Sequence, residues 1–200
     1  MVYLTGDTHG ELDRFKHGRL RWLGKRDIVV VLGDFGFVWD GSKEEQKKLD
    51  WLRKRPYTLL FLDGAHENYD LLAQYPVEER FGGRVQALGG NVYHVCRGSV
   101  LELEGKKYLF AHAMTSHPDV REEDRYYMRG TMDIDCFFFE GIDGYISMCG
   151  HTPTDSIVWK KDRRYLDEPG NSIWCNDRHN VYLLDCGCGF AGGRLACLCL

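Results

Sequence analysis

The chain has 200 residues, of which 44% are hydrophobic and 28% are charged, and its formal net charge is −4. This composition excludes a disordered chain, a collagen and a coiled coil, and the charge gives no electrostatic reason to expect nucleic acid as a partner. The length is compatible with one domain, and we expect it to cover residues 1–200.

The first part of the chain alternates continuous apolar runs with helical spacing of apolar residues. Strands are expected at 2–7, 28–34 and 58–64. Helices are expected at 13–24, 43–55 and 68–74. Continuous apolar runs are typical of strands that are buried on both faces. The β-α-β-α-β-α order therefore predicts a parallel sheet with helices packed over it.

The second part of the chain consists mainly of short β-like runs. They lie at 92–97, 99–104, 107–112, 145–149, 156–160, 172–175, 180–185 and 194–199. A polar stretch over 119–128 interrupts them and is predicted to form a helix or an irregular cap. The pattern predicts a second, largely antiparallel sheet within the same α/β domain.

The chain begins without a basic and apolar leader, and no run is long and apolar enough to span a membrane. We therefore expect a cytoplasmic protein with no membrane partner, whose cysteines are reduced. The pairs Cys186/Cys188 and Cys197/Cys199 allow a zinc site, but their place in apolar β-like runs favours small buried side chains.

Polar side chains able to bind metal follow the apolar runs at the points where those runs end. They are Asp7, His9, Asp34, His66, His112 and His151. Ligands of open α/β sheets bind outside the carboxyl ends of the strands, so these side chains are expected to converge on one edge. Carboxylate oxygens together with imidazole nitrogens suit Mn, Fe, Zn or Co better than an all-oxygen Ca site.

This ordered set of motifs resembles the calcineurin-like metallophosphoesterase superfamily. The resemblance is carried by Gly6-Asp7-Thr8-His9-Gly10, Ala111-His112-Ala113, Gly150-His151-Thr152-Pro153 and the tail around Leu184-Asp185-Cys186-Gly187. Within it, the sequence looks closest to bacterial and phage Ser/Thr protein phosphatases and the related dinucleotide tetraphosphatases. The resemblance implies a four-layer α/β/β/α sandwich of two mixed sheets and a phosphorylated substrate, either a phosphoprotein or a nucleotide.

The resemblance also implies a site with two divalent metal ions. Asp7 and His9 would hold the first ion, and Asp34 would bridge it to the second. His112 and His151 would hold that second ion. Such a pair of ions would clamp a phosphoryl group during in-line displacement.

Catalytic and substrate-binding roles follow from the same resemblance. A metal-activated hydroxide would attack phosphorus, with Asp34 and His66 as catalytic residues and His66 as the general acid for the leaving oxygen. Arg129 would contact the phosphate, for which its bidentate guanidinium is suited. Asn68 would either contact the substrate or metal in place of a missing ligand, or cap the helix that follows it.

The sequence departs from the family pattern in two of its motifs. The expected Asn of Gly-Asn-His-Glu is Ala65, and the Asp-Arg pair expected after Asp34 is missing, with Phe37 at the position of its Asp. Asp40 is a candidate substitute for that Asp. The aromatic residues Phe35, Phe37 and Trp39 either pack in the core or form a rim that stacks a nucleobase, and packing is the favoured interpretation.

These observations predict a metal-dependent phosphoester hydrolase that is similar to Ser/Thr protein phosphatases. The missing Arg makes a phosphodiesterase or a dinucleotide polyphosphate hydrolase an alternative, because a diester carries less charge than a monoester. The substitutions at Ala65 and Phe37 motivate a further alternative, a catalytically impaired metallophosphoesterase scaffold.

Overall fold

The computed structural model describes residues 1–113, 141–154, 159–160, 163–164, 172–188 and 191–200. The predicted polar cap over 119–128 and the predicted phosphate ligand Arg129 lie outside the described residues.

The first sheet contains the three predicted N-terminal strands. Its order is β14 (Leu198–Cys199), β1 (Val2–Thr5), β2 (Ile28–Val31), β3 (Thr58–Phe61), β6 (Val92–Val95), β5 (Gly83–Gly89) and β4 (Val77–Arg80). Strands β1, β2, β3 and β6 pair in parallel, and the remaining pairs are antiparallel. The prediction of parallel N-terminal strands is confirmed.

The second sheet is formed by the later strands. Its order is β12 (Trp174–Cys175), β13 (Val181–Leu183), β9 (Ile146–Cys149), β8 (Lys106–Phe110) and β7 (Val100–Leu103). Strands β8, β9 and β13 run parallel, so this sheet is mixed rather than largely antiparallel. A separate pair joins β10 (Trp159–Lys160) to β11 (Arg163–Arg164).

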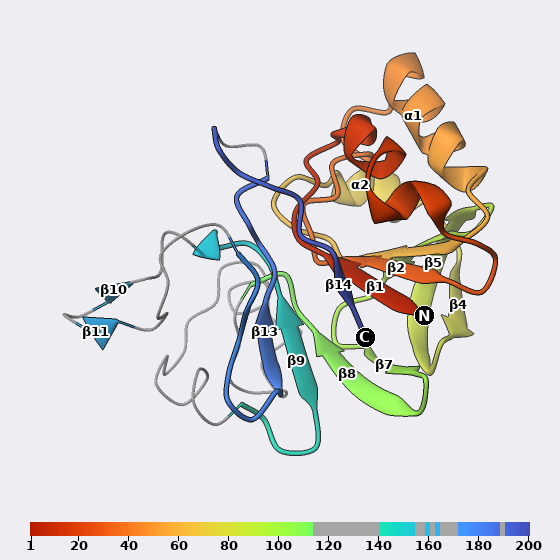
Figure 1. Cartoon of the computed structure of the whole chain (residues 1–200). Helices are drawn as coiled ribbons and strands as arrows, with labels where there is room; N and C mark the ends of the chain where they lie inside the picture. The colour runs from red at the N-terminus through yellow and green to blue at the C-terminus, as the bar shows by residue number, and fades with distance from the viewer. Residues whose placement is uncertain (114–140, 155–158, 161–162, 165–171, 189–190) are drawn as a thin grey trace.

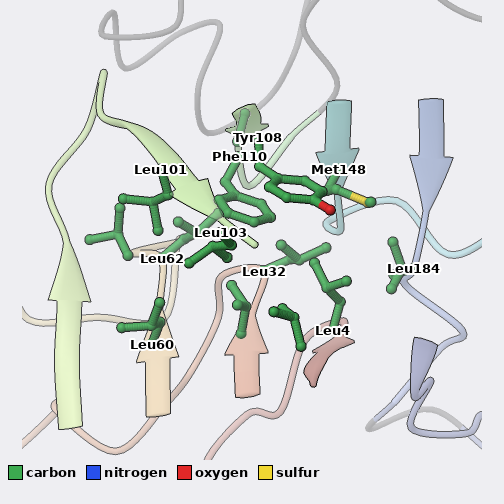
Figure 2. Packing of buried hydrophobic residues seen from close by; sticks show 14 of the residues in the cluster. Leu4, Leu32, Leu60, Leu62, Leu101, Leu103, Tyr108, Phe110, Met148 and Leu184 are labelled. Carbon is green, nitrogen blue, oxygen red and sulfur yellow. The ribbon is translucent and has the colours of Figure 1, made fainter. Parts of the chain in front are cut away.

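The two sheets pack face to face around the larger hydrophobic core. Leu4, Leu32 and Leu60 point from the first sheet toward Phe110 and Met148 of the second, as Figure 2 shows. The alternate positions of β1–β3 face the other way and pack against the helices. The strands are therefore buried on both faces, as their continuous apolar runs predict.

Helices cover the outer face of the first sheet (Figure 1). Helix α1 (Lys43–Arg53) begins at Ser42, whose hydroxyl accepts the N–H of Glu45. Helix α2 (Tyr69–Leu72) is a single turn. Two mixed sheets with helices outside the first form an α/β sandwich, consistent with the family resemblance. The helical layer that the resemblance implies outside the second sheet is not among the described residues. Within the described part of the chain, no helix has the length and apolar character needed to span a bilayer.

One local prediction fails, and one pair of strands is not predicted by the sequence. Instead of one helix over 13–24, the chain forms the short 3-10 helices η1 (Leu12–Lys16) and η2 (Arg19–Trp22). Gly18 lies between them at φ 58° and ψ −145°, a conformation that no helix contains. The hairpin of β4 and β5 was not expected, because all of β4 is exposed and its charged sequence carries no apolar alternation.

Candidate metal centre

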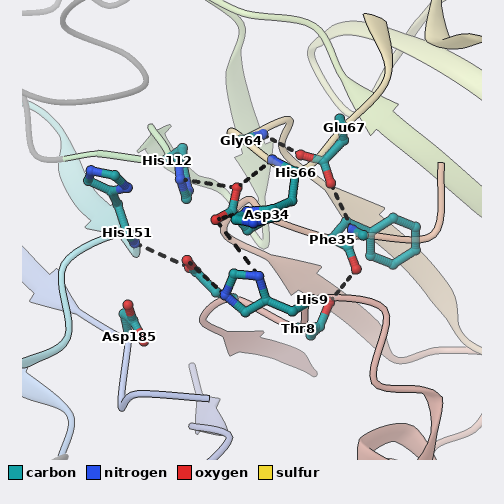
Figure 3. A network of polar contacts seen from close by, with 12 residues as sticks. Thr8, His9, Asp34, Phe35, Gly64, His66, Glu67, His112, His151 and Asp185 are labelled. Carbon is teal, nitrogen blue, oxygen red and sulfur yellow. Dashed lines mark hydrogen bonds and ion pairs between the residues drawn. The ribbon is translucent and has the colours of Figure 1, made fainter. Parts of the chain in front are cut away.

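The carboxyl ends of strands from both sheets meet at one edge, where the predicted ligands lie (Figure 3). Asp7 and Asp34 follow β1 and β2, and His66 follows β3. His112 and His151 follow the parallel strands β8 and β9 of the second sheet. The strand-end rule thus brings together residues that are far apart in the sequence.

Asp34 lies at the centre of this cluster. Its Oδ1 is 3.5 Å from Nε2 of His112, and its Oδ2 is 2.9 Å from Nδ1 of His66 and 4.0 Å from Nδ1 of His9. Nε2 of His9 is in turn 4.0 Å from Oδ2 of Asp7. The two oxygens of one carboxylate therefore face different groups of ligands.

The described residues contain two groups of side chains that are able to hold a metal ion, and both include Asp34. One is Asp7, Asp34 and His112, and the other is His9, Asp34 and His66. Within each group the ligand atoms all lie within 4.8 Å of one another. His151 belongs to neither group, but its ring centroid is 4.8 Å from that of His112 and its backbone N–H donates to Asp7.

The backbone conformation at the ends of the strands determines where the side chains of the ligands point. Asp34 has a φ of 43°, in the left-handed region that residues with a side chain rarely adopt. A Cβ at Gly33 would overlap the ring of His112, and one at Gly64 would overlap the carboxylate of Asp34. Glycine at these two positions is what lets the ligands approach the strand ends.

Hydrogen bonds tie the ligand loops to one another. The backbone N–H groups of Thr8 and His9 donate to the carbonyl of Asp34 at 3.1 and 2.8 Å. The buried carboxylate of Glu67 accepts the N–H of Gly36 at 2.8 Å and that of Gly64. Burial raises the pKa of Glu67 to about 8. The ligands are therefore held on a preorganised frame rather than on free loops.

His112 has the chemistry of a metal ligand. Its Nδ1 is 3.0 Å from the carbonyl of Leu32, and because a carbonyl only accepts, Nδ1 carries the proton. Nε2 then presents a lone pair toward Asp34, is fully buried and has no hydrogen-bond partner among the described residues. An orphaned buried nitrogen is costly, and a divalent cation would satisfy it. The residues present therefore fit a metal ion.

The comparison with protein families supports the same conclusion. The family model described as calcineurin-like phosphoesterase matches residues 1–185. The chain belongs to the calcineurin-like phosphoesterase family. Membership implies metal-dependent phosphoester hydrolysis. No curated protein and no solved structure matched the chain.

Several carboxyl groups lie close together at the centre of this calcineurin-like phosphoesterase. Burial raises the pKa of Asp7 well above its usual range, and the neighbouring carboxylates of Asp185 and Asp34 raise it further. Burial also raises the pKa of Asp34, but the neighbouring imidazole of His112 and the hydrogen bonds from His66 outweigh it and leave that pKa lowered. Cations would relieve the repulsion among these carboxylates.

Asp185 is a member of this cluster that the sequence analysis did not assign to the site. It follows β13, which runs parallel to β9, and it lies near His151 in Figure 3. Its carboxylate is close enough to Asp7 to raise the pKa of that residue. The same strand-end signal that identified His151 applies to Asp185. The sequence motif places Asp185 only in the tail that carries the family resemblance, and the strand-end rule is what identifies it as a member of the site.

Other predicted residues have local partners. Asn68 caps α2: its Oδ1 accepts the N–H of Leu71 at 3.1 Å, and its Nδ2 donates to the carbonyl of Trp39 at 2.9 Å. Its substrate contact stays a prediction. Asp40 accepts the N–H of Ser42, while Asp34 is the carboxylate that contacts the ring of His66.

The three aromatic residues after Asp34 separate into two kinds. Phe35 and Phe37 are fully buried among the helices and the first sheet, in line with core packing. Trp39 is 52% exposed and does not belong to that core. Phe37 therefore places a buried apolar ring at the position where the family resemblance leads one to expect a carboxylate.

Proposed function

We propose that this protein is a dinuclear metal-dependent phosphoester hydrolase in which Asp34 would be a ligand of both ions. The observation that carries the proposal is the position of the Asp34 carboxylate, whose Oδ1 faces His112 and whose Oδ2 faces His9 and His66. A carboxylate with ligands on both of its oxygens is suited to neutralise two cations at once.

The donor groups divide between the two positions. Asp7, Asp34 and His112 would hold one ion, and His9 with Asp34 the other. This grouping differs from the one that the resemblance implies, in which Asp7 and His9 share an ion. The predicted ligand His151 stands beside His112. When bound, two divalent ions such as Mn, Fe, Zn or Co polarise the phosphoryl oxygens and acidify a water molecule.

His66 is placed to act on the leaving group. Its side chain is 55% exposed, and its Nδ1 is held 2.9 Å from Asp34. The carboxylate orients the ring and favours a proton on Nδ1, so Nε2 is the atom left for the substrate. In its protonated form, His66 donates the Nε2 proton to the leaving oxygen.

The absence of the Arg that the resemblance implies after Asp34 favours a phosphodiester over a phosphomonoester. A monoester dianion requires more positive charge than a diester monoanion, and the buried Phe37 and Val38 stand at the positions of the expected Asp-Arg pair. Monoester hydrolysis of the protein phosphatase type is the second candidate, supported by the Gly150-His151-Thr152-Pro153 motif. An impaired scaffold is the third, supported by Ala65, which supplies no donor atom beside His66.

Metal analysis combined with turnover assays tests this proposal. The purified protein is loaded with Mn²⁺, dialysed and assayed on bis(p-nitrophenyl) phosphate and on p-nitrophenyl phosphate. We expect two metal equivalents and faster hydrolysis of the diester. Asp34→Asn should lose both metal and turnover, whereas Asp50→Asn removes an exposed carboxylate on α1 and should lose neither. A protein that binds metal without turning over either ester would be a scaffold instead.

A further inference from the structure

A cleft of about 330 Å³ opens beside the metal centre. His9 and His66 of the metal centre line it, together with Trp39, Asp40, Glu44 and Lys48. The volume lies at the lower end of the range for small-molecule pockets, roughly 300–1,000 Å³. A group that occupies this cleft therefore sits next to the proposed general acid, where the leaving group of a phosphoester must be.

Trp39 is an exposed side chain on a firmly held backbone. The carboxylate of Glu45 is buried and accepts the N–H groups of Trp39 and Asp40, both at 2.8 Å. On its other side, the carbonyl of Trp39 accepts the amide of Asn68 at 2.9 Å. The indole is nevertheless 52% exposed, and its ring centroid is 6.1 Å from that of His66. A fixed, exposed aromatic face next to a reacting group is suited to stack a planar ligand.

The charges of the cleft limit what that ligand is. Asp40 and Glu44 are acidic, and Lys48 is the one lysine or arginine among the described residues that line the cleft. The start of α1 offers little to an anion, because Ser42 N–H already donates to Asp40 and Glu45 N–H to Ser42. A polyphosphate chain is disfavoured here, and a planar group that is neutral or cationic is favoured.

We propose that Trp39 stacks the base of a nucleoside leaving group, so that the substrate is a phosphodiester of a nucleoside. The inference rests on the proposed function, which places the phosphorus at the metal centre. The aromatic face supplies stacking and the cleft accommodates one nucleoside. Because stacking on an aromatic side chain is tolerant of sequence, we expect little discrimination among the bases.

The test measures adenosine binding by titration calorimetry in the presence of Mn²⁺, with ribose as the comparison ligand. Adenosine should bind and ribose should not. Trp39→Ala should weaken adenosine binding by about 10-fold or more, and Trp39→Phe should restore most of the affinity. Trp22→Ala is the matched control, because Trp22 is also exposed, at 73%, and does not line the cleft.

Turnover of bis(p-nitrophenyl) phosphate is measured on the same variants to separate the two proposals. If the wild type hydrolyses the diester but does not bind adenosine, or if Trp39→Ala binds it as tightly as the wild type, the stacking inference is overturned and the hydrolase stands. If no divalent ion supports turnover, the proposed function fails, and Trp39-dependent adenosine binding then still supports the cleft as a nucleoside site.

Discussion

Two buried clusters of carboxylate and imidazole groups lie near the end of β3, and they differ in how well their members satisfy one another. In the first, the metal centre, carboxylates face carboxylates, and no group in the described part of the chain forms a hydrogen bond with His112 Nε2. The second, which we name the Asp63 network, consists of Asp63, His94, Arg97 and Gln86.

The Asp63 network is complete in itself. Asp63 Oδ1 is 2.9 Å from His94 Nε2, and its Oδ2 accepts the guanidinium of Arg97 at 2.7 Å. His94 Nδ1 reaches Gln86 Oε1 at 2.7 Å. Burial raises the pKa of Asp63, but His94 and Arg97 outweigh it and leave that pKa lowered.

This difference indicates which cluster is built for a ligand. A satisfied network stabilises the fold, and adding a cation to it would break existing bonds. A cluster with like charges and an orphaned nitrogen gains stability only when something binds. Residue type alone does not separate the two, because both contain a buried Asp in contact with a buried His.

The largest expected effect comes from removing a charge at the metal centre. Asp7→Asn should lower turnover by roughly 10³-fold or more, because the metal loses an anionic ligand. The metal-free variant should nevertheless be at least as stable to heat as the metal-free wild type, since burial and two neighbouring carboxylates disfavour the charged form of Asp7. Thermal unfolding with excess chelator measures this. If metal-free Asp7→Asn were much less stable than the metal-free wild type, the metal centre would not be an unsatisfied cluster, and its difference from the Asp63 network would be contradicted.

The opposite result is expected in the Asp63 network. Asp63→Asn should lower the free energy of unfolding by about 3 kcal/mol, because it leaves buried partners without their anion. Metal content of the folded variant should be unchanged. Urea unfolding together with metal analysis of the folded fraction checks both expectations.

The pH dependence of stability provides a second check on Asp63. A carboxyl whose pKa is lowered on folding stabilises the protein above its ordinary pKa, and this contribution is lost as the pH falls through the lowered value. The wild type should therefore lose stability in acid more steeply than Asp63→Asn. If the two proteins lose stability equally as the pH falls, the charge of Asp63 contributes nothing to the stability of the fold.

His66→Ala should affect chemistry while leaving metal in place. Turnover of esters with poor leaving groups should fall by about 10²-fold, and p-nitrophenyl esters should be affected less, because a good leaving group needs little protonation. Asp34 would keep its contact with His112 in this variant. Equal slowing on every leaving group would remove His66 from the role of general acid.

The smallest effect is expected from restoring the family's amide ligand. Ala65→Asn should raise metal occupancy and increase turnover by about 10-fold, since it adds one donor beside His66. Binding isotherms for Mn²⁺ and turnover at saturating metal measure the two effects. If neither changes, neither of the two metal positions lies near residue 65.

Much of the centre was predictable because the signal is local. Each ligand follows an apolar run, and parallel strands end at a common edge, so Asp7, Asp34 and His151 were expected to converge. Asp185 carries the same signal and was overlooked. The helix expected over 13–24 was wrong because Gly18 adopts a conformation outside any helix. The sequence alone does not show which φ a glycine adopts.

For the aromatic residues after Asp34, the local sequence pattern does not predict which side chains are buried. Phe35, Phe37 and Trp39 alternate regularly, and nothing in that spacing separates a core ring from an exposed one. The distinction arises from Glu45 and Asn68, which bind the backbone of Trp39 from two helices and turn the chain there. Such contacts depend on packing that no single segment encodes.

The sequence by itself determined the chemistry of this protein: the donor types, their places after strands, and thereby the family. Tertiary structure decided how the donors are grouped, with Asp34 between His112 and His66, and which cluster is left unsatisfied. The physical reason is distance along the chain. Leu32, which fixes the tautomer of His112, is 80 residues away from it, and only the packing of two sheets brings them into contact.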